Sequence, residues 1–251
     1  MARLFLRLAY DGTMYHGWQM QPNGTTVQQV MITEMQKLLQ HPVSLTGCGR
    51  TDTGVHAREF YAHFDSDHKL INDPDELVRR LNRMLPGDVV VYKGYPVADH
   101  CNSRFDAISR TYKYYTSCAK NPFDRSWVVK LNKTPDIAAM NSAAAVLFEF
   151  IDFTSFSKLH TQTATNNCKI SEAHWDKEGD KTIFTITADR FLRNMVRAIV
   201  GTLLEVGYGK ESVESFRQII EKQDRCHAGM SVPAHGLFLE KVQYPEDYFK
   251  L

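Results

Sequence analysis

Residues 47–58 read GCGRTDTGVHAR and combine three glycines with the side chains of Arg50, Asp52 and His56. The glycines permit backbone angles that are closed to other residues and let another chain approach closely. A carboxylate in such a loop can act as a nucleophile or base, and a guanidinium two residues away favours its ionised form. The competing interpretation is a structural ion pair in a tight turn, because surface ion pairs are common and weak. His56 taken alone favours a structural hydrogen bond.

The same stretch does not match a nucleotide-binding loop. A G-x-G-x-x-G motif starting at Gly47 would need glycine at position 52, which is aspartate, and a helix would have to follow. The residues at 60–64, FYAHF, instead alternate like a strand. No P-loop lysine follows Gly24 or Gly47. Asp52 therefore remains as the candidate for chemistry.

An arginine stripe is predicted on a mostly apolar helix over residues 190–206. Arg190, Arg193 and Arg197 are spaced three and four apart, so they would share one face. Ion pairs to buried acids would explain such a stripe, and so would the binding of phosphate or carboxylate groups. The sequence leaves both interpretations open.

Basic and aromatic residues alternate in the segment SRFDAISRTYKYY at 103–115. On a strand, Tyr112 and Tyr114 would point one way and Lys113 and Tyr115 the other. Aromatic rings beside cations suit a flexible polynucleotide, because rings stack on bases and cations contact phosphates. A tyrosine-rich sheet face is the alternative, and without other evidence it is favoured.

Strands and helices alternate along the chain in an order that predicts the α+β class. The first half is expected to place the loop at 47–58 between two strands, and its elements are strands at 4–10, 43–47, 60–64, 88–97 and 108–117 with helices at 27–40 and 73–85. The second half is expected to contain helices at 135–150, 190–206 and 212–221, a hairpin at 169–188 that turns at 178–180, and a closing strand at 236–244. This order suggests two halves, 1–120 and 121–251, around a mostly antiparallel sheet.

Composition restricts the class of protein. The chain has 251 residues, of which 43% are hydrophobic and 24% charged, and a net charge of +1 that does not by itself favour nucleic acid. Five cysteines without a C-x-x-C pair argue against a disulfide framework and a zinc site, so a reducing cytosol is expected. Arg3 and Arg7 interrupt the first apolar run, and no stretch could span a bilayer. We therefore expect a cytoplasmic protein with no metal and no membrane partner.

Seven sequence blocks, in the same order, resemble the tRNA pseudouridine synthases of the TruA type. They are YDGTMYHGWQMQPNGTTVQ, GRTDTGVHA, LNRMLPGDVVV, SRFDAISRTYKY, DFTSF, FLRNMVRAIVGTLLEVG and PAHGLFLEKVQYP. The resemblance covers nearly the whole chain, and GRTDxGVHA is a specific signature. It implies a fold of two α+β halves that share an extended, mostly antiparallel sheet, with helices on one face and an active cleft between the halves.

The resemblance also implies an activity, a substrate and site residues. Members isomerise uridines at positions thirty-eight, thirty-nine and forty of the anticodon arm of tRNA, need no cofactor and are typically homodimers. The catalytic aspartate falls on Asp52, which we expect to be the nucleophile, while the point of its attack stays open. Tyr112 falls on the tyrosine that packs against the target base and Arg197 on the arginine that pairs with the catalytic carboxylate. Arg50 falls on an arginine that helps to displace the base, and Leu237 on an apolar residue of the pocket.

Two departures and two rival functions remain. Cys101 stands where the family has an aromatic residue, and TQTATNNCKI at 161–170 matches poorly, so the resemblance does not extend to these details of pocket lining and RNA contact. A non-catalytic RNA-binding protein could use the same basic and aromatic surfaces. A glycoside hydrolase would need a second acid opposite Asp52. Glu59 is the nearest in sequence, and nothing in the sequence places it there.

Overall fold

The computed structural model describes residues 1–158 and 165–249, and it divides into two compact units. The first comprises Met1–Ile108 and Leu239–Leu251, and the second Ser109–Phe238. Residues 109–120, which belong to the first of the two predicted halves, lie in the second unit. Each unit combines strands with helices, so the predicted α+β class is confirmed.

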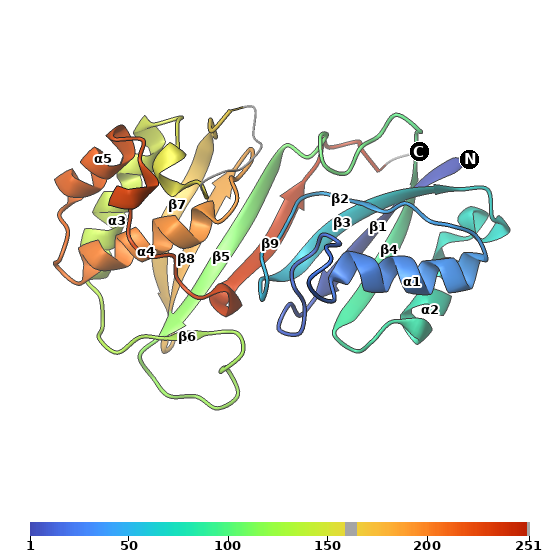
Figure 1. Cartoon of the computed structure of the whole chain (residues 1–251), viewed down its shortest axis with the longest axis horizontal. Helices are drawn as coiled ribbons and strands as arrows, with labels where there is room; N and C mark the ends of the chain where they lie inside the picture. The colour runs from blue at the N-terminus through green and yellow to red at the C-terminus, as the bar shows by residue number, and fades with distance from the viewer. Residues whose placement is uncertain (159–164, 250–251) are drawn as a thin grey trace. The chain divides into compact units, whose positions relative to one another are not determined.

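The first unit has the strand order β4-β1-β3-β9 (Figure 1). Strand β1 pairs antiparallel with β3 and β4, and β2 pairs antiparallel with β3. Its strands are β1 (Ala2–Tyr10), β2 (Thr46–Gly47), β3 (His56–Ser66), β4 (Val89–Val97) and, from Leu239 on, β9 (Leu237–Gln243). The register of β1 places Leu4 opposite Phe64 on β3 and opposite Pro96 on β4. The loop at 47–58 thus begins in β2 and ends in β3, as predicted.

Two capped helices accompany these strands, α1 (Val27–Leu39) and α2 (Pro74–Met84). The Thr26 side chain accepts a hydrogen bond from the Gln29 amide, and the Asp73 side chain accepts one from the Glu76 amide, so both helices have a side-chain N-cap. The buried face of α1 repeats every four residues, at Val27, Met31, Met35 and Leu39.

The strand predicted at 60–64 is confirmed as part of β3, and these residues are buried on both faces of the strand. Every residue of 60–64 is less than 8% exposed. The C-terminal segment supplies the second cover, because the Tyr61 ring lies 5.1 Å from Tyr244 and 5.4 Å from Phe249, centroid to centroid. Those partners follow some 180 positions later, so no local pattern around β3 could indicate them.

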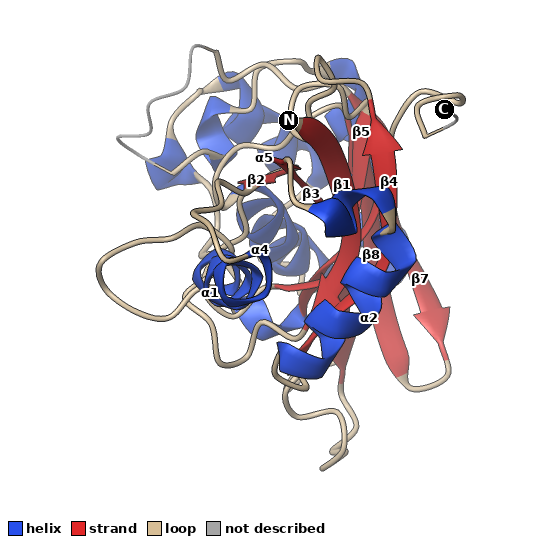
Figure 2. Cartoon of the chain, turned by 90° about the vertical axis from the view of Figure 1, so that its right-hand side faces the viewer, coloured by secondary structure: helices blue, strands red, loops and turns tan. Residues whose placement is uncertain are grey.

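The second unit has the strand order β5-β8-β7, with β6 parallel to β5. Its strands are β5 (Ser109–Ser117), β6 (Val129–Lys130), β7 (Ile170–Glu178) and β8 (Lys181–Ala188). Its helices are α3 (Ile137–Val146), α4 (Met195–Gly207) and α5 (Val213–Glu221), and Figure 2 shows α4 and α5 on one side of β7 and β8. The hairpin turns at Gly179, whose φ of 62° confirms the predicted turn. Short 3-10 helices cover Lys69–Asn72, Leu147–Glu149, Thr154–Phe156, Arg225–His227 and Ala234–Gly236.

Helix α4 begins at Met195, five residues later than predicted. Asn194 has a left-handed backbone, with φ 66° and ψ 2°, which a right-handed helix cannot contain. Arg190 and Arg193 therefore precede the helix, and the predicted arginine stripe is wrong except for Arg197. No helix in residues 1–158 and 165–249 is long and apolar enough to cross a membrane.

Candidate active site

Asp52 lies half-buried in the loop between β2 and β3. The Val55 amide donates to the Asp52 carbonyl at 3.1 Å and closes a turn, and Gly54 within that turn has φ 78°. The position of this loop is set by a second segment of the chain.

That second segment, residues 10–18, forms hydrogen bonds with the loop, and we call it the clasp. The Tyr10 hydroxyl lies 2.8 Å from Thr51 Oγ1, next to Asp52 in sequence. The Gly54 amide donates to the Tyr15 carbonyl at 3.2 Å, and the Trp18 amide to the Thr51 carbonyl at 3.4 Å. The motifs YDGTMYHGW and GRTDTGVHA are therefore two sides of one local structure.

Two glycines allow the clasp to lie directly against the loop. A Cβ on Gly12 would be 2.0 Å from the Val55 carbonyl oxygen, and one on Gly17 would be 2.3 Å from the Thr51 carbonyl oxygen. Gly17 also has φ 84°, which L side chains rarely adopt. No larger residue fits at either position without moving the backbone that carries Asp52.

His56 holds the far end of the loop. Its ring is 1% exposed, and Nδ1 accepts a hydrogen bond from the Gly12 amide at 2.9 Å. The same nitrogen lies 3.0 Å from a carboxylate oxygen of Asp11. His56 is therefore a buried hydrogen-bonding residue of the loop, as the sequence favoured.

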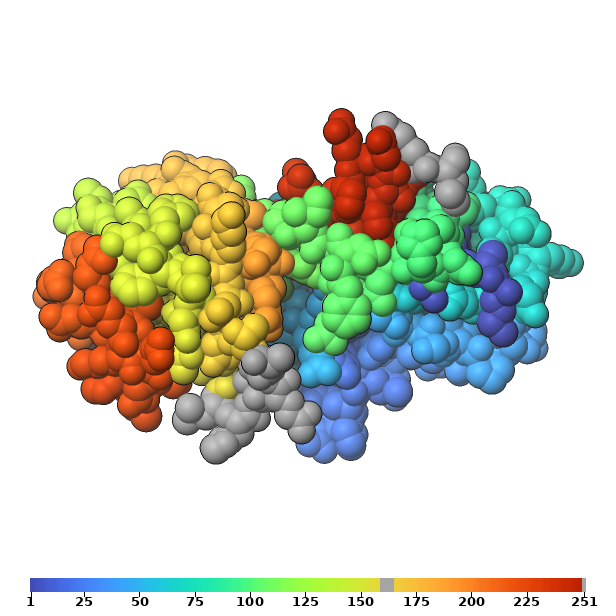
Figure 3. Space-filling view, turned by 90° about the horizontal axis from the view of Figure 1, so that it is seen from above, coloured from blue at the N-terminus to red at the C-terminus, as the bar shows by residue number. Residues whose placement is uncertain are grey.

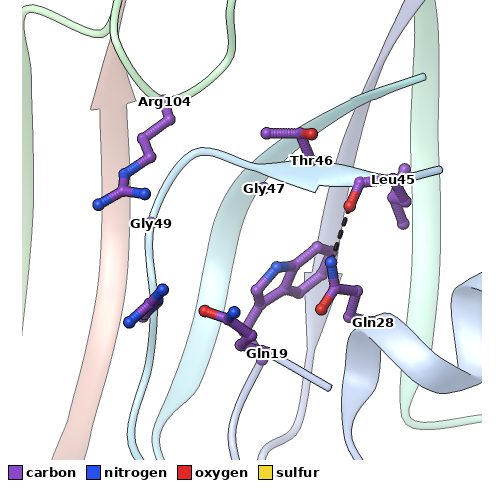
Figure 4. Close-up of a pocket in the computed structure, with 9 residues that line it drawn as sticks. Gln19, Gln28, Leu45, Thr46, Gly47, Gly49 and Arg104 are labelled. Atoms are coloured by element: carbon purple, nitrogen blue, oxygen red, sulfur yellow. Dashed lines mark hydrogen bonds between the residues drawn. The ribbon is translucent and has the colours of Figure 1, made fainter. Parts of the chain in front are cut away.

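Arg50 is exposed and lines a cavity of about 190 Å³ in the first unit (Figure 4). It forms no ion pair with a carboxylate anywhere in the described part of the chain, so the structural ion pair with Asp52 is not what fixes this turn. Trp18, Gln28, Leu45, Gly49 and Arg104 also line the cavity.

Arg197 is half-buried on α4 in the second unit. Its Nε donates to the Val232 carbonyl at 2.8 Å, which orients the guanidinium. Helix α4 and the backbone at Met230 lie in close contact, because a Cβ on Gly201 would be 1.9 Å from the Met230 carbonyl oxygen. Arg197 is a residue that the sequence predicted, whereas its backbone acceptor is not.

Tyr112 and Leu237 also belong to the second unit. Tyr112, on β5, is half-buried and makes an edge contact with Phe191 at 5.1 Å between centroids. Leu237 is 5% exposed and begins β9. The Tyr114 hydroxyl donates to the Pro233 carbonyl at 2.8 Å, so the segment 230–237 connects α4 to β5. The structure thus places Arg50 and Asp52 on one loop, and the other three residues on elements joined by that segment.

The second carboxylate that a glycoside hydrolase needs is not provided by Glu59. Its oxygens lie 3.1 Å from Arg7 Nε and accept a hydrogen bond from the Val242 amide at 3.0 Å. Glu59 is therefore engaged within the sheet of the first unit.

The two departures and the question of a metal can be placed on the described residues. Cys101 is buried, and its carbonyl accepts a hydrogen bond from Arg3 at 2.8 Å. The first four residues of the segment 161–170 lie outside the described residues. Within 1–158 and 165–249, no three His, Cys, Asp or Glu residues gather in a way that could hold a metal ion.

Comparison with known proteins connects this geometry to one family. The model of a family described as tRNA pseudouridine synthase matches residues 150–245. A tRNA pseudouridine synthase A from Parabacteroides distasonis is 55% identical over 249 residues, which cover 99% of this chain and 98% of the relative. The protein of the same name from Bacteroides thetaiotaomicron is 55% identical over 252 residues, covering 99% and 93%. One from Exiguobacterium sibiricum is 37% identical over 246 residues, covering 98% of each chain.

A solved structure of a dye-decolorizing protein from V. cholerae aligns with a TM-score of only 0.18 at 11% identity, which carries no argument about the fold. The sequence relatives, in contrast, extend over both units, including the Asp52 loop and its clasp. The chain therefore belongs to the tRNA pseudouridine synthases, a family of isomerases.

Proposed function

We propose that this chain converts uridine to pseudouridine at positions thirty-eight, thirty-nine and forty in the anticodon stem-loop of tRNA, with Asp52 as the nucleophile. It does so in the cytoplasm, as a homodimer and without a cofactor. The full-length relatives, at 55% identity, are named for this reaction on tRNA. The observation that carries the assignment of Asp52 is its half-buried place on a loop whose backbone the clasp fixes on both sides of it.

The reaction breaks the N1–C1′ bond, turns the uracil while it stays bound, and joins C5 to C1′. The C5 proton leaves and N1 gains one, so the product has the mass of the substrate. Because the target base must first leave its stack, the enzyme needs about a few kcal/mol from RNA contacts. Arg50, exposed at the edge of the Asp52 loop, is suited to occupy the vacated space.

Asp52 has to be ionised and aimed at the ribose or the base. Attack on C1′, addition to the ring and removal of a sugar proton all require this same carboxylate. In the proposal Arg197, oriented by the Val232 carbonyl, supplies the opposing charge that favours the ionised form. Tyr112 stacks on the uracil and accepts the C5 proton at the end. Leu237 excludes water, so that the free base recombines instead of being lost.

Replacing Asp52 by asparagine tests the assignment. We expect Asp52→Asn to abolish tritium release from C5-labelled uridine in tRNA while RNA affinity is retained, because the amide keeps the shape of the side chain and loses the nucleophile. Asp67→Asn is the matched control, since Asp67 is exposed in the same unit and outside the loop. Turnover by Asp52→Asn near the wild-type rate would remove Asp52 from the mechanism.

The mass of the RNA after reaction with the wild type, measured beside tritium release, separates an isomerase from the rival classes. A non-catalytic RNA-binding protein would form no product even as wild type. A glycoside hydrolase would release free uracil, and the RNA would lose the mass of the base. An isomerase leaves the mass of the RNA unchanged.

A further inference from the structure

Trp18 combines deep burial with a hydrogen-bond donor that has no acceptor in the protein. The residue is 2% exposed, and its ring packs against Phe60 at 4.1 Å and stacks on Tyr10 at 6.1 Å, centroid to centroid. Within residues 1–158 and 165–249, no group accepts a hydrogen bond from the indole N–H. Because buried polar groups are nearly always hydrogen-bonded, this donor calls for an acceptor from outside the chain.

The indole nitrogen opens onto the cavity that Trp18 lines. In the described part of the chain, the fully enclosed side-chain polar atoms without a partner are Arg7 Nε and Trp175 Nε1, so Trp18 Nε1 is still accessible. Gly47, which lines the same cavity, keeps this nitrogen uncovered, since a Cβ there would lie 2.4 Å from it. The cavity therefore presents an unpaired N–H on its inner wall.

Hydrogen bonds within the protein hold the wall of this cavity in place. The Gln28 amide oxygen accepts from the Met20 amide at 2.8 Å, and its amide nitrogen donates to the Leu45 carbonyl at 2.7 Å (Figure 4). The Ser103 hydroxyl donates to the Thr46 carbonyl at 2.8 Å. Both ends of the Gln28 amide are thus engaged inside the protein, whereas the indole N–H is left for a ligand.

The mouth of the cavity lies at the surface of the first unit. Gln19, Arg50 and Arg104 line the cavity and are exposed. Figure 3 shows the segment that carries Arg104, coloured green, at the surface beside the red segment at residues 239–249. A group that belongs to a large ligand can therefore enter from this side.

The size of the cavity indicates one group of a polymer instead of a complete small molecule. Its volume of about 190 Å³ far exceeds the roughly 10–15 Å³ that a single water needs. It is below the roughly 300–1,000 Å³ of pockets that enclose whole ligands. A single base of an RNA strand lies between these limits.

The inner wall favours a base over a phosphate. Trp18 and Leu45, which form it, are 2% and 3% exposed, and the indole N–H is a neutral donor. A phosphate placed there would exchange its hydration for this one neutral donor, which is unfavourable for a charged group. A base has apolar faces and carries acceptors on its edge, and proteins bind unpaired RNA bases through such edges.

The cavity lies close to Asp52 along the chain. Gly49 lines the cavity and precedes Asp52 by three residues, so their Cα atoms are at most about 11 Å apart. Stacked nucleotides of one strand follow each other at about 3.4 Å. A base in the cavity therefore belongs to a nucleotide within about three positions of the one at Asp52.

We propose that the cavity holds the base of an unpaired nucleotide of the substrate RNA, within about three positions of the target uridine. A carbonyl oxygen of that base accepts the hydrogen bond from the Trp18 indole N–H. The inference rests on the proposed function for the identity of the RNA. It adds a positioning contact that places the strand relative to the Asp52 loop.

NMR of the indole N–H groups in isotope-labelled protein observes this contact directly. The chain has three tryptophans, and Trp127→Phe identifies the signal of the 45% exposed Trp127. Solvent exchange separates the accessible Trp18 nitrogen from the enclosed nitrogen of Trp175. We expect an anticodon-arm RNA to move the Trp18 signal downfield and to leave the Trp175 signal in place. An unmoved Trp18 signal in the RNA complex overturns the proposal.

Abasic substitutions in the RNA distinguish a base from the sugar and the phosphate. Each unpaired nucleotide within three positions of the target is replaced in turn by an abasic ribose, which keeps its phosphate. One of these RNAs should lose the Trp18 shift and bind about twofold to about thirteenfold more weakly, the value of one hydrogen bond. A shift that persists in every abasic RNA overturns the proposal, as does the same shift caused by inorganic phosphate alone.

Gly49 allows the cavity to be filled from the protein side. A Cβ on Gly49 would meet no atom within 4 Å, and the backbone there has no positive φ, so leucine is tolerated in the free protein. We expect Gly49→Leu to lose the Trp18 shift and to weaken RNA binding. Gly87→Leu is the matched control, because Gly87 has the same two properties and does not line the cavity. Equal losses in both variants would overturn the proposal, and urea unfolding shows that both are folded.

Pseudouridine formation by the wild type is measured separately from these contacts. Product without a Trp18 shift rejects the base site alone. A Trp18 shift that depends on one base, without product, supports the site and rejects the proposed reaction.

Discussion

Tyr10→Phe isolates the contribution of the clasp to the position of Asp52. The Tyr10 ring is 4% exposed; it packs edge-on against Phe60 at 5.7 Å and stacks on Trp18 at 6.1 Å, centroid to centroid. Phenylalanine preserves these ring contacts. Only the hydroxyl is lost, and with it the 2.8 Å hydrogen bond to Thr51.

The expected loss of activity follows from the strength of that bond. A hydrogen bond of this kind contributes about 0.5–1.5 kcal/mol to the folded arrangement. If the loop must be returned to the same position in every turnover, that free energy adds to the barrier, and kcat/KM falls by about twofold to about thirteenfold. The free energy of unfolding should fall by a similar amount. RNA affinity should not change, because no RNA contact is removed.

Tritium release gives kcat/KM, filter binding gives the RNA dissociation constant, and urea unfolding gives the stability. The matched control is Tyr15→Phe, which removes another clasp hydroxyl, the donor to Asp88 at 2.6 Å, without contact to Thr51. It should lose stability and retain kcat/KM. Unchanged turnover in Tyr10→Phe would refute the reasoning, and so would an equal loss of turnover in Tyr15→Phe.

Two further perturbations act at other points. Gly201→Ala should lower turnover strongly and stability by about 1–3 kcal/mol, because the new methyl group would displace the Met230 backbone and with it the Val232 acceptor of Arg197; tritium release and urea unfolding measure both, and full activity would contradict it. Burial, reinforced by the charge of Arg3, lowers the pKa of His63, so the neutral ring that accepts from the Ser103 amide is favoured in the folded state. Its contribution to stability is complete above the ordinary pKa of about 6.5 and is lost as the pH falls toward the lower folded pKa. His63→Asn should therefore weaken the loss of stability in urea unfolding between about pH 7 and about pH 5, and an unaltered pH dependence would contradict this.

Local patterns predicted most elements because their causes are local. The N-caps at Thr26 and Asp73 and the hairpin turn at Gly179 depend on residues within one or two turns. The start of α4 was missed because the backbone of Asn194 overrides an apolar periodicity that continues through it. The two-residue β6 is too short to produce any pattern. The second buried face of β3 depends on aromatic residues at the far end of the chain.

The same distinction between local and distant causes applies to the residues of the candidate site. Arg50 and Asp52 stand on one short loop, so their types and spacing were enough to propose them as candidates. The acceptor of Arg197 is a backbone carbonyl, and every residue carries one, so no residue type indicates Val232. Gln28 and Ser103, which shape the cavity, likewise act through backbone groups of distant segments.

The clasp explains why the motif YDGTMYHGW accompanies the motif GRTDTGVHA in this sequence. A loop with three glycines can approach an RNA strand closely, but the same freedom would let its carboxylate move. The clasp removes that freedom through contacts to Thr51, Gly54 and Val55, on both sides of Asp52. A displacement of about 1 Å at a reacting group can cost about a hundredfold in rate. Residues 10–18 should therefore influence turnover more than RNA affinity, although in the proposed mechanism none of them touches the uridine.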